Sequence, residues 1–149
     1  MTNLMDRREV LGATSLAAAT CLLGSGGAEA ELASGNLTVH VLDLYSGTPA
    51  KGVKVELFMR RGEQLTALKS VVTDTDGRSG TLLAGDAFAA GRYLLAVDLS
   101  DYFKSADETL PANFYRKLSM EFEVTDVTLP VQIPLQCTPW TQACSVLPG

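Results

Sequence analysis

Hydrophobic and polar residues alternate along much of the chain after residue 36. In LTVHVLDL (37–44), the apolar residues at positions 37, 39 and 41 alternate with Thr38, His40 and Leu42. The stretch GVKVELFM (52–59) repeats this period of two. Successive side chains of a strand point to opposite faces of its sheet, so this pattern predicts two half-buried β-strands.

The later segments also favour strands, with one exception. Turn residues separate these segments, and Asp76-Gly77 marks a tight turn. Only SDYFKSADE (100–108) indicates a helix, with Ser100 as its N-cap. Further strands are expected over 67–75, 91–99, 117–125, 128–136 and 141–147. The expected fold is all-β: a two-sheet sandwich of seven or eight strands with one short helix.

The first thirty residues have the order of a bacterial export signal. Arg7-Arg8 precede an apolar run over 10–23, and the segment closes on Ala28-Glu29-Ala30. Charge, apolar run and A-x-A site in this order are typical of a cleaved signal, and the paired arginines indicate the twin-arginine type. The run of about 14 residues is shorter than the ~20 that span a bilayer.

These features predict an export signal over 1–30 and one domain over 31–149. The domain is expected to be periplasmic or secreted, with no membrane attachment after cleavage. Lipid attachment at Cys21 is the alternative to cleavage after Ala30. An oxidising periplasm makes Cys137 and Cys144 a candidate disulfide, and two free thiols remain the other possibility.

Composition and charge narrow the classes of function. Hydrophobic residues at 46% and charged residues at 19% fit a globular domain with a core. A net charge of −5 argues against nucleic-acid binding, because no basic surface is available to displace counterions from phosphates. The sequence holds no P-loop, dinucleotide fingerprint or nucleophile elbow, so a triad built on His40 would lack a recognisable serine. One histidine and two domain cysteines are too few ligands for a structural zinc site.

Five segments occur in an order and spacing that carry a family resemblance: LTVHVLDLYSGTPAKGVKVEL, VTDTDGRSGTLL, GRYLLAVDLSDYFKS, FYRKLSMEFEV and PVQIPLQCTPW. They resemble segments of the transthyretin and 5-hydroxyisourate hydrolase family. The matching parts are its first two strands, its T-D-x-D-G-R turn, its strand followed by a short helix, and two later strands. The resemblance covers about residues 36–140.

The resemblance implies a transthyretin-like dimer of dimers, with substrate-sized clefts between the dimers. In the hydrolase branch, ring opening of 5-hydroxyisourate during urate breakdown depends on four groups. They are a first-strand histidine, the D-G-R arginine, a second histidine in an H-x-H-x-P strand and a C-terminal Y-R-G-S. His40 and Arg78 match the first two. The H-x-H-x-P motif falls on 130–134, where Gln132 replaces the second histidine, and 145–148 lack the Y-R-G-S motif.

The resemblance therefore assigns three candidate catalytic residues. His40 is the expected base, Arg78 the expected clamp for an oxyanion or ureide carbonyl, and Gln132 an orienting amide. The resemblance favours a 5-hydroxyisourate hydrolase, weak or altered because half of the family site is missing. The alternative is a transthyretin-like protein that binds a small ligand or a partner without turnover. We expect a homotetramer, a small planar ureide or purine-derived ligand, and no cofactor.

Overall fold

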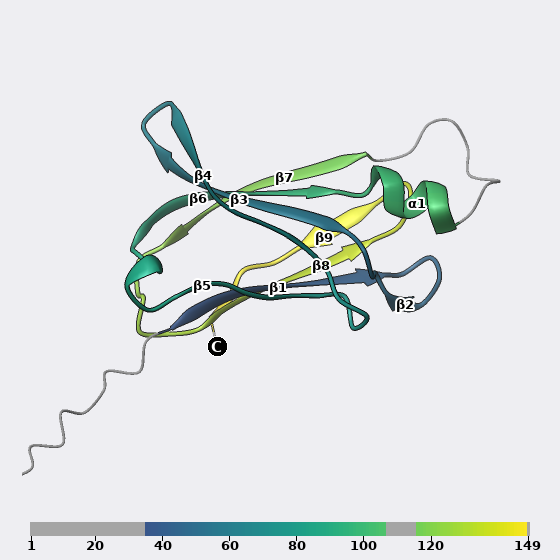
Figure 1. The fold of residues 1–149 in the computed structure, drawn as a ribbon, viewed down its shortest axis with the longest axis horizontal. Helices are drawn as coiled ribbons and strands as arrows, with labels where there is room; N and C mark the ends of the chain where they lie inside the picture. The colour runs from purple at the N-terminus through teal and green to yellow at the C-terminus, as the bar shows by residue number, and fades with distance from the viewer. Residues whose placement is uncertain (1–34, 107–115, 149) are drawn as a thin grey trace, which may run out of the picture. The chain divides into compact units, whose positions relative to one another are not determined.

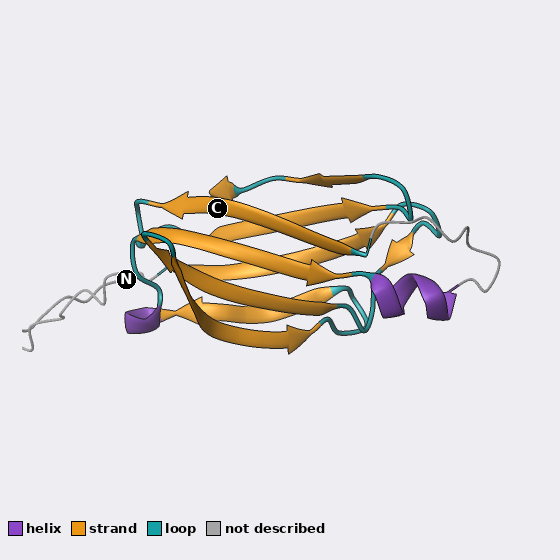
Figure 2. Cartoon of the chain, turned by 90° about the horizontal axis from the view of Figure 1, so that it is seen from above, coloured by secondary structure: helices purple, strands orange, loops and turns teal. Residues whose placement is uncertain are grey.

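The computed structural model describes residues 35–106 and 116–148, which form a two-sheet β-sandwich (Figure 1). Its strands are β1 (Asn36–Asp43), β2 (Thr48–Pro49), β3 (Lys54–Arg61), β4 (Gln64–Val72), β5 (Arg78–Ala84), β6 (Gly91–Asp98), β7 (Lys117–Val124), β8 (Val131–Cys137), β9 (Gln142–Cys144) and β10 (Leu147–Pro148). Eight of these have three or more residues, which confirms the expected sandwich. The helix α1 (Ser100–Ala106) and the 3₁₀ turn η1 (Gly85–Ala87) lie at opposite ends of the sandwich, as Figure 2 shows.

The first sheet is built around β1. This strand pairs antiparallel with β5 on one side and parallel with β8 on the other. Strands β9 and β10 pair with the other edge of β8, and β2 pairs with the end of β1. The second sheet has the order β4-β3-β6-β7 and is antiparallel throughout. Because β1 is central, its outward side chains have neighbours on both sides.

The inward positions of the alternating strands form the core between the sheets. Leu37, Val39 and Val41 of β1 are at most 1% exposed, whereas the residues between them are partly exposed. Burying one such aliphatic side chain stabilises the fold by about 1.5–3 kcal/mol. The other strands contribute fully buried partners: Val55, Leu57, Tyr93, Leu95, Val97, Ile133 and Leu135. The period of two read from the sequence is therefore confirmed.

Strand β5 does not follow this period of two. The sequence predicts only the Asp76-Gly77 turn before it and no strand over 78–84. Gly80 has a φ of 65°, and the strand buries the consecutive residues Leu82 and Leu83 rather than alternate ones. Its register with β1 shifts twice. An irregular strand of this kind carries no alternating signal.

The start of α1 also differs from the expectation. Asp98 Oδ1 accepts a hydrogen bond from the Ser100 backbone N–H at 2.9 Å, so Asp98 supplies the side-chain cap. The Ser100 hydroxyl instead donates to the Arg116 carbonyl oxygen at 3.3 Å. The N-cap prediction at Ser100 is wrong, and residues 107–108 of the expected helix lie outside the described residues.

The expected export signal over 1–30, including Cys21 and the site after Ala30, lies outside the described residues. Over 35–106 and 116–148, we find no helix with the length and apolar character needed to cross a membrane.

Candidate functional site

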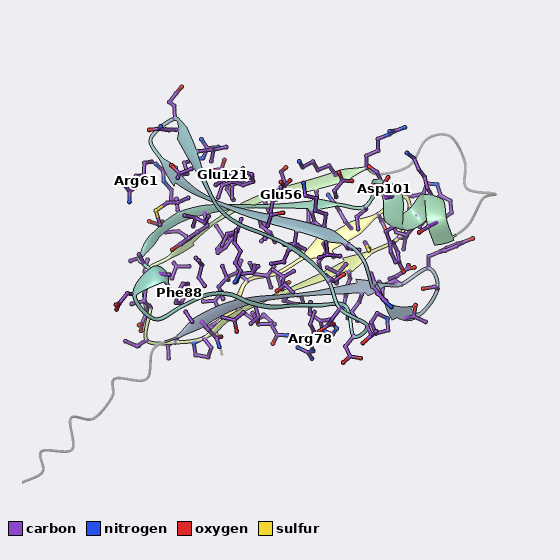
Figure 3. The ribbon with its side chains drawn as sticks, viewed as in Figure 1. Glu56, Arg61, Arg78, Phe88, Asp101 and Glu121 are labelled. Atoms are coloured by element: carbon purple, nitrogen blue, oxygen red, sulfur yellow. The ribbon has the colours of Figure 1, made fainter. Side chains whose placement is uncertain are left out.

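Strands β5, β1 and β8 bring the three candidate residues to one outward sheet surface. Arg78 lies opposite His40 in the β5–β1 pairing, and Gln132 lies beside Thr38 in the β1–β8 pairing. Thr38 and His40 are two residues apart on β1, so all four share the face turned away from the core. Figure 3 shows Arg78 at this surface, on the side away from the second sheet. The structure thus places the candidate base, cation and amide on three neighbouring strands.

The His40 imidazole has a defined hydrogen-bond partner. Its Nε2 lies 2.9 Å from the carbonyl oxygen of Asp76. A carbonyl oxygen only accepts hydrogen bonds, so Nε2 carries the proton in this contact. In the neutral ring the lone pair is then on Nδ1. The imidazole can therefore accept a proton at Nδ1 while Nε2 remains bound to the turn.

The turn that supplies this carbonyl is organised by Asp74. Asp74 Oδ1 accepts hydrogen bonds from the backbone N–H groups of Asp76 and Arg78, both at 2.9 Å. The Gly77 N–H donates to the Asp74 carbonyl oxygen at 3.0 Å, and the Asp74 N–H donates to the Arg78 carbonyl oxygen at 2.9 Å. Such a side-chain-to-backbone pattern fixes a tight turn. The T-D-x-D-G-R segment is therefore a closed turn that supplies the hydrogen-bond partner of His40 and fixes the backbone of Arg78.

A bulge in β5 completes the arrangement. Between the pairs Thr38–Thr81 and His40–Arg78 the register shifts by one residue. Ser79 Oγ accepts a hydrogen bond from the Val39 N–H at 2.9 Å, in place of a ladder carbonyl. Bulges of this kind re-aim side chains next to functional sites. Here the bulge lets Arg78 face His40 directly.

The Gln132 side of the site is neutral and partly apolar. Gln132 is half-buried on β8 and lies opposite Leu147 of β10, which is 48% exposed. Pro134, two residues further along β8, lies beside His40. The C-terminal strand β10 therefore pairs with β8, and it places the apolar side chain of Leu147 next to Gln132. An amide offers one donor end and one acceptor end, but it does not exchange protons near neutral pH.

Sequence reasoning missed three residues of this site. Asp74 and Ser79 set the geometry through backbone hydrogen bonds, and Leu147 borders Gln132. The only available signal was for Asp74, because aspartate two residues before another turn residue favours a side-chain-closed turn. In the part of the chain that the structure describes, no cluster of three His, Cys, Asp or Glu side chains is arranged to hold a metal ion.

Cys137 and Cys144 are free thiols in the structure, which matches the second of the two alternatives for this cysteine pair. The reason is the register of the β8–β9 hairpin. Cys137 lies opposite Gln142, and Cys144 lies opposite Leu135, which places the two cysteines diagonally. The two cysteines would lie opposite each other only if the hairpin centred between Trp140 and Thr141, and the observed pairing centres it one residue earlier.

Alkylation should show that both thiols are free and that Cys137 is protected in the folded protein. Burial, and secondarily the charge of Asp43, raises the pKa of Cys137 to about 12, and burial also raises the pKa of Cys144. At pH 8 about 10⁻⁴ of Cys137 is then the reactive thiolate, so iodoacetamide should label it only after unfolding. Mature protein unfolded without reductant should gain two adducts by intact mass. Adducts that form only after reduction would contradict the free-thiol structure.

Comparisons with known proteins show which family the chain resembles. The model of the HIUase/Transthyretin family matches residues 37–144. "5-hydroxyisourate hydrolase 2" of Rhizobium meliloti is 38% identical over 109 residues, covering 72% of this chain and 91% of the relative. The "5-hydroxyisourate hydrolase" of Ralstonia nicotianae is 37% identical over 109 residues, covering 72% and 93%.

Two solved structures share the fold. An (S)-allantoin synthase superposes with a TM-score of 0.68 at 30% identity, covering 78% of this chain, which spans 44% of that longer chain. The transthyretin of Sparus aurata superposes with a TM-score of 0.69 at 22% identity, covering 76% of this chain and 97% of the other. The second likeness is one of fold alone.

Proposed function

Because the chain belongs to the HIUase/transthyretin family, we propose that it catalyses the ring-opening hydrolysis of 5-hydroxyisourate in urate breakdown. The observation that carries the proposal is the placement of His40 opposite Arg78 on one outward surface. The imidazole in this arrangement keeps Nδ1 available while Nε2 donates to Asp76. A base beside a cation is the pair that hydrolysis of a cyclic amide needs.

Each residue has a distinct part in the reaction. His40 Nδ1 takes a proton from water as its oxygen attacks a ring carbonyl carbon. The guanidinium of Arg78 stabilises the oxyanion that develops, through its planar set of N–H donors. The ring C–N bond then breaks, the imidazolium returns its proton to the leaving nitrogen, and the product carries a new carboxylate. Gln132 orients a substrate amide by donating to its oxygen and accepting from its N–H.

A second candidate function follows from the Gln132 side of the site. The neutral amide and the neighbouring Leu147 suit the binding of a small planar ligand without proton transfer. In this case the protein would hold a ureide or purine-derived molecule and release it unchanged. The hydrolase proposal is preferred because the register pairs a possible base, His40, with a cation, Arg78.

The site lies on the outer face of a sheet, and we infer that other copies of the chain enclose it. The family resemblance supports a homotetramer that covers this face, and residues 1–30 support export to the periplasm by a twin-arginine-type signal. Light scattering of the mature domain tests the tetramer. Intact mass of the exported chain tests cleavage after Ala30 against lipid attachment at Cys21.

The hydrolase proposal is tested on mature protein from Glu31 onward. Fresh 5-hydroxyisourate is generated from urate, and its ultraviolet decay is followed with and without protein. Decay should be faster with the protein and should return to the spontaneous rate in the His40→Ala variant. Spontaneous decay with the wild-type protein would contradict the hydrolase proposal and favour the ligand-binding alternative.

Gln132→His should raise the rate by about tenfold or more, because it restores a second proton-transfer group at the position where the family has one. The matched control is Gln136→His, which adds a histidine to the same strand and face but beside Leu42. The control should leave the rate unchanged. An equal rate in wild type and Gln132→His would mean that the surface has been adapted to another ligand.

A further inference from the structure

We propose that Asp74 is a positioning residue that holds His40 with Nε2 protonated, so that Nδ1 is the basic nitrogen of the site. Its catalytic consequence rests on the proposed function, but the assignment of the nitrogen rests on the hydrogen bonds alone. Asp74 does not touch His40 in any hydrogen bond of the structure. It acts through the backbone of the 74–78 turn.

The first step is the closure of that turn by one carboxylate oxygen. Asp74 Oδ1 accepts from the N–H groups of Asp76 and Arg78, each at 2.9 Å. Hydrogen bonds to an ionised carboxylate are stronger than those between neutral groups. The two bonds fix the 75–76 and 77–78 peptide groups. The 76–77 peptide between them is held by the Gly77 N–H, which donates to the Asp74 backbone carbonyl oxygen at 3.0 Å. The direction of the Asp76 carbonyl is thereby set.

The second step is the contact between that carbonyl and the imidazole. The Asp76 oxygen lies 2.9 Å from His40 Nε2, across 36 residues of sequence. The turn is also held to β1 by the Val41 N–H, which donates to the Gly77 carbonyl oxygen at 2.8 Å. The carbonyl therefore meets the ring at a fixed place on the sheet. This contact selects the Nε2–H form of the neutral imidazole.

The third step concerns Arg78. Its own backbone N–H is one of the two donors to Asp74, and its Cα lies opposite that of His40. The Asp74 carboxylate thus holds both the backbone of Arg78 and the turn whose Asp76 carbonyl bonds to His40. Removing it should disturb both residues while leaving the core untouched, because Asp74 is exposed.

Nuclear magnetic resonance can test this directly, because His40 is the only histidine in the chain. In wild-type protein with a neutral imidazole, the ¹⁵N shifts of His40 should show a protonated Nε2 and an unprotonated Nδ1. In Asp74→Ala, both shifts should move toward the values of two exchanging tautomers. Asp74→Asn keeps an oxygen acceptor and should restore the wild-type shifts. An unprotonated Nε2 in the wild type, or unchanged shifts in Asp74→Ala, would overturn the proposal.

The matched control is Asp126→Ala. Asp126 Oδ1 also accepts from a backbone N–H two residues on, that of Thr128, at 2.9 Å, but on the β7–β8 connection. The Asp126→Ala variant should lose a comparable local turn without changing the ¹⁵N shifts of His40. A wild-type tautomer measurement needs no variant, so it remains decisive even if Asp74→Ala folds poorly.

Kinetics separate this inference from the proposed function. Where wild-type protein accelerates 5-hydroxyisourate decay, Asp74→Ala should lower kcat about tenfold and Asp74→Asn should recover most of it, as expected for a residue that orients a histidine. Wild-type protein without activity would contradict the proposed function, yet the tautomer result would stand. Full activity in Asp74→Ala together with altered shifts would overturn the catalytic consequence of the positioning and leave the hydrolase intact.

Discussion

A His40→Ala variant is expected to hydrolyse 5-hydroxyisourate about 10²–10⁴ times more slowly than the wild type, because it removes the group that activates water. The loss should lie mainly in kcat, since Arg78 and Gln132 remain to hold the substrate. His40 is partly exposed and contributes one hydrogen bond to the turn, so its loss should cost little stability. Initial rates of ultraviolet decay measure the effect.

The control for this variant is Leu42→Ala, on the same strand and face but two residues away. It truncates a side chain of comparable size without removing an acid–base group. A rate that falls equally in both variants would indicate a general disturbance of the sheet. A His40→Ala rate equal to that of the wild type would exclude His40 as the base.

The fold was predictable because several strands obey a simple period. Strands β1 and β8, and β3 as far as Leu57, bury every second residue. Their pattern is therefore visible in the sequence without any knowledge of their partners. Strand β5 does not, since a left-handed Gly80 and a register shift interrupt it. The position of Arg78 could be anticipated only from the family resemblance, and the bulge explains how the chain achieves it.

The details of the site were less accessible from the sequence. The dependence of His40 on Asp74 passes through backbone atoms of a turn 36 residues away, and no side-chain pattern encodes it. The partner of Cys137 across the β8–β9 hairpin was hidden for a similar reason. A shift of one residue in the hairpin centre moves Cys137 from Cys144 to Gln142.

The replacement of a histidine by Gln132 changes the chemistry more than the shape of the site. The amide keeps a polar group beside Thr38, while Leu147 of β10 occupies the next strand. Of the three candidate residues, only His40 can move a proton near neutral pH. A single acid–base group must therefore serve both the attack of water and the departure of nitrogen. This accounts for the expectation of a slow hydrolase that Gln132→His would accelerate.

The largest stability loss is expected from Gly77→Ala, at about 3 kcal/mol or more. Gly77 has a φ of 72°, which costs an alanine about 1–2 kcal/mol. A Cβ there would also lie 2.3 Å from the Val41 carbonyl oxygen and 3.1 Å from the Ala50 nitrogen. These are backbone atoms that already bond to each other at 3.0 Å, so they have little room to retreat.

Urea unfolding of Gly77→Ala and Gly62→Ala isolates the effect of this close approach. Gly62 has a similar φ of 61°, but a Cβ added there would meet no atom within 4 Å. Gly62→Ala should therefore cost only the left-handed backbone penalty, about 1–2 kcal/mol. Because the 74–78 turn carries the Asp76 carbonyl, Gly77→Ala should also release His40 from its partner and slow hydrolysis. Equal unfolding midpoints in the two variants would contradict the tight docking of the turn on β1, and with it the means by which the turn holds the imidazole.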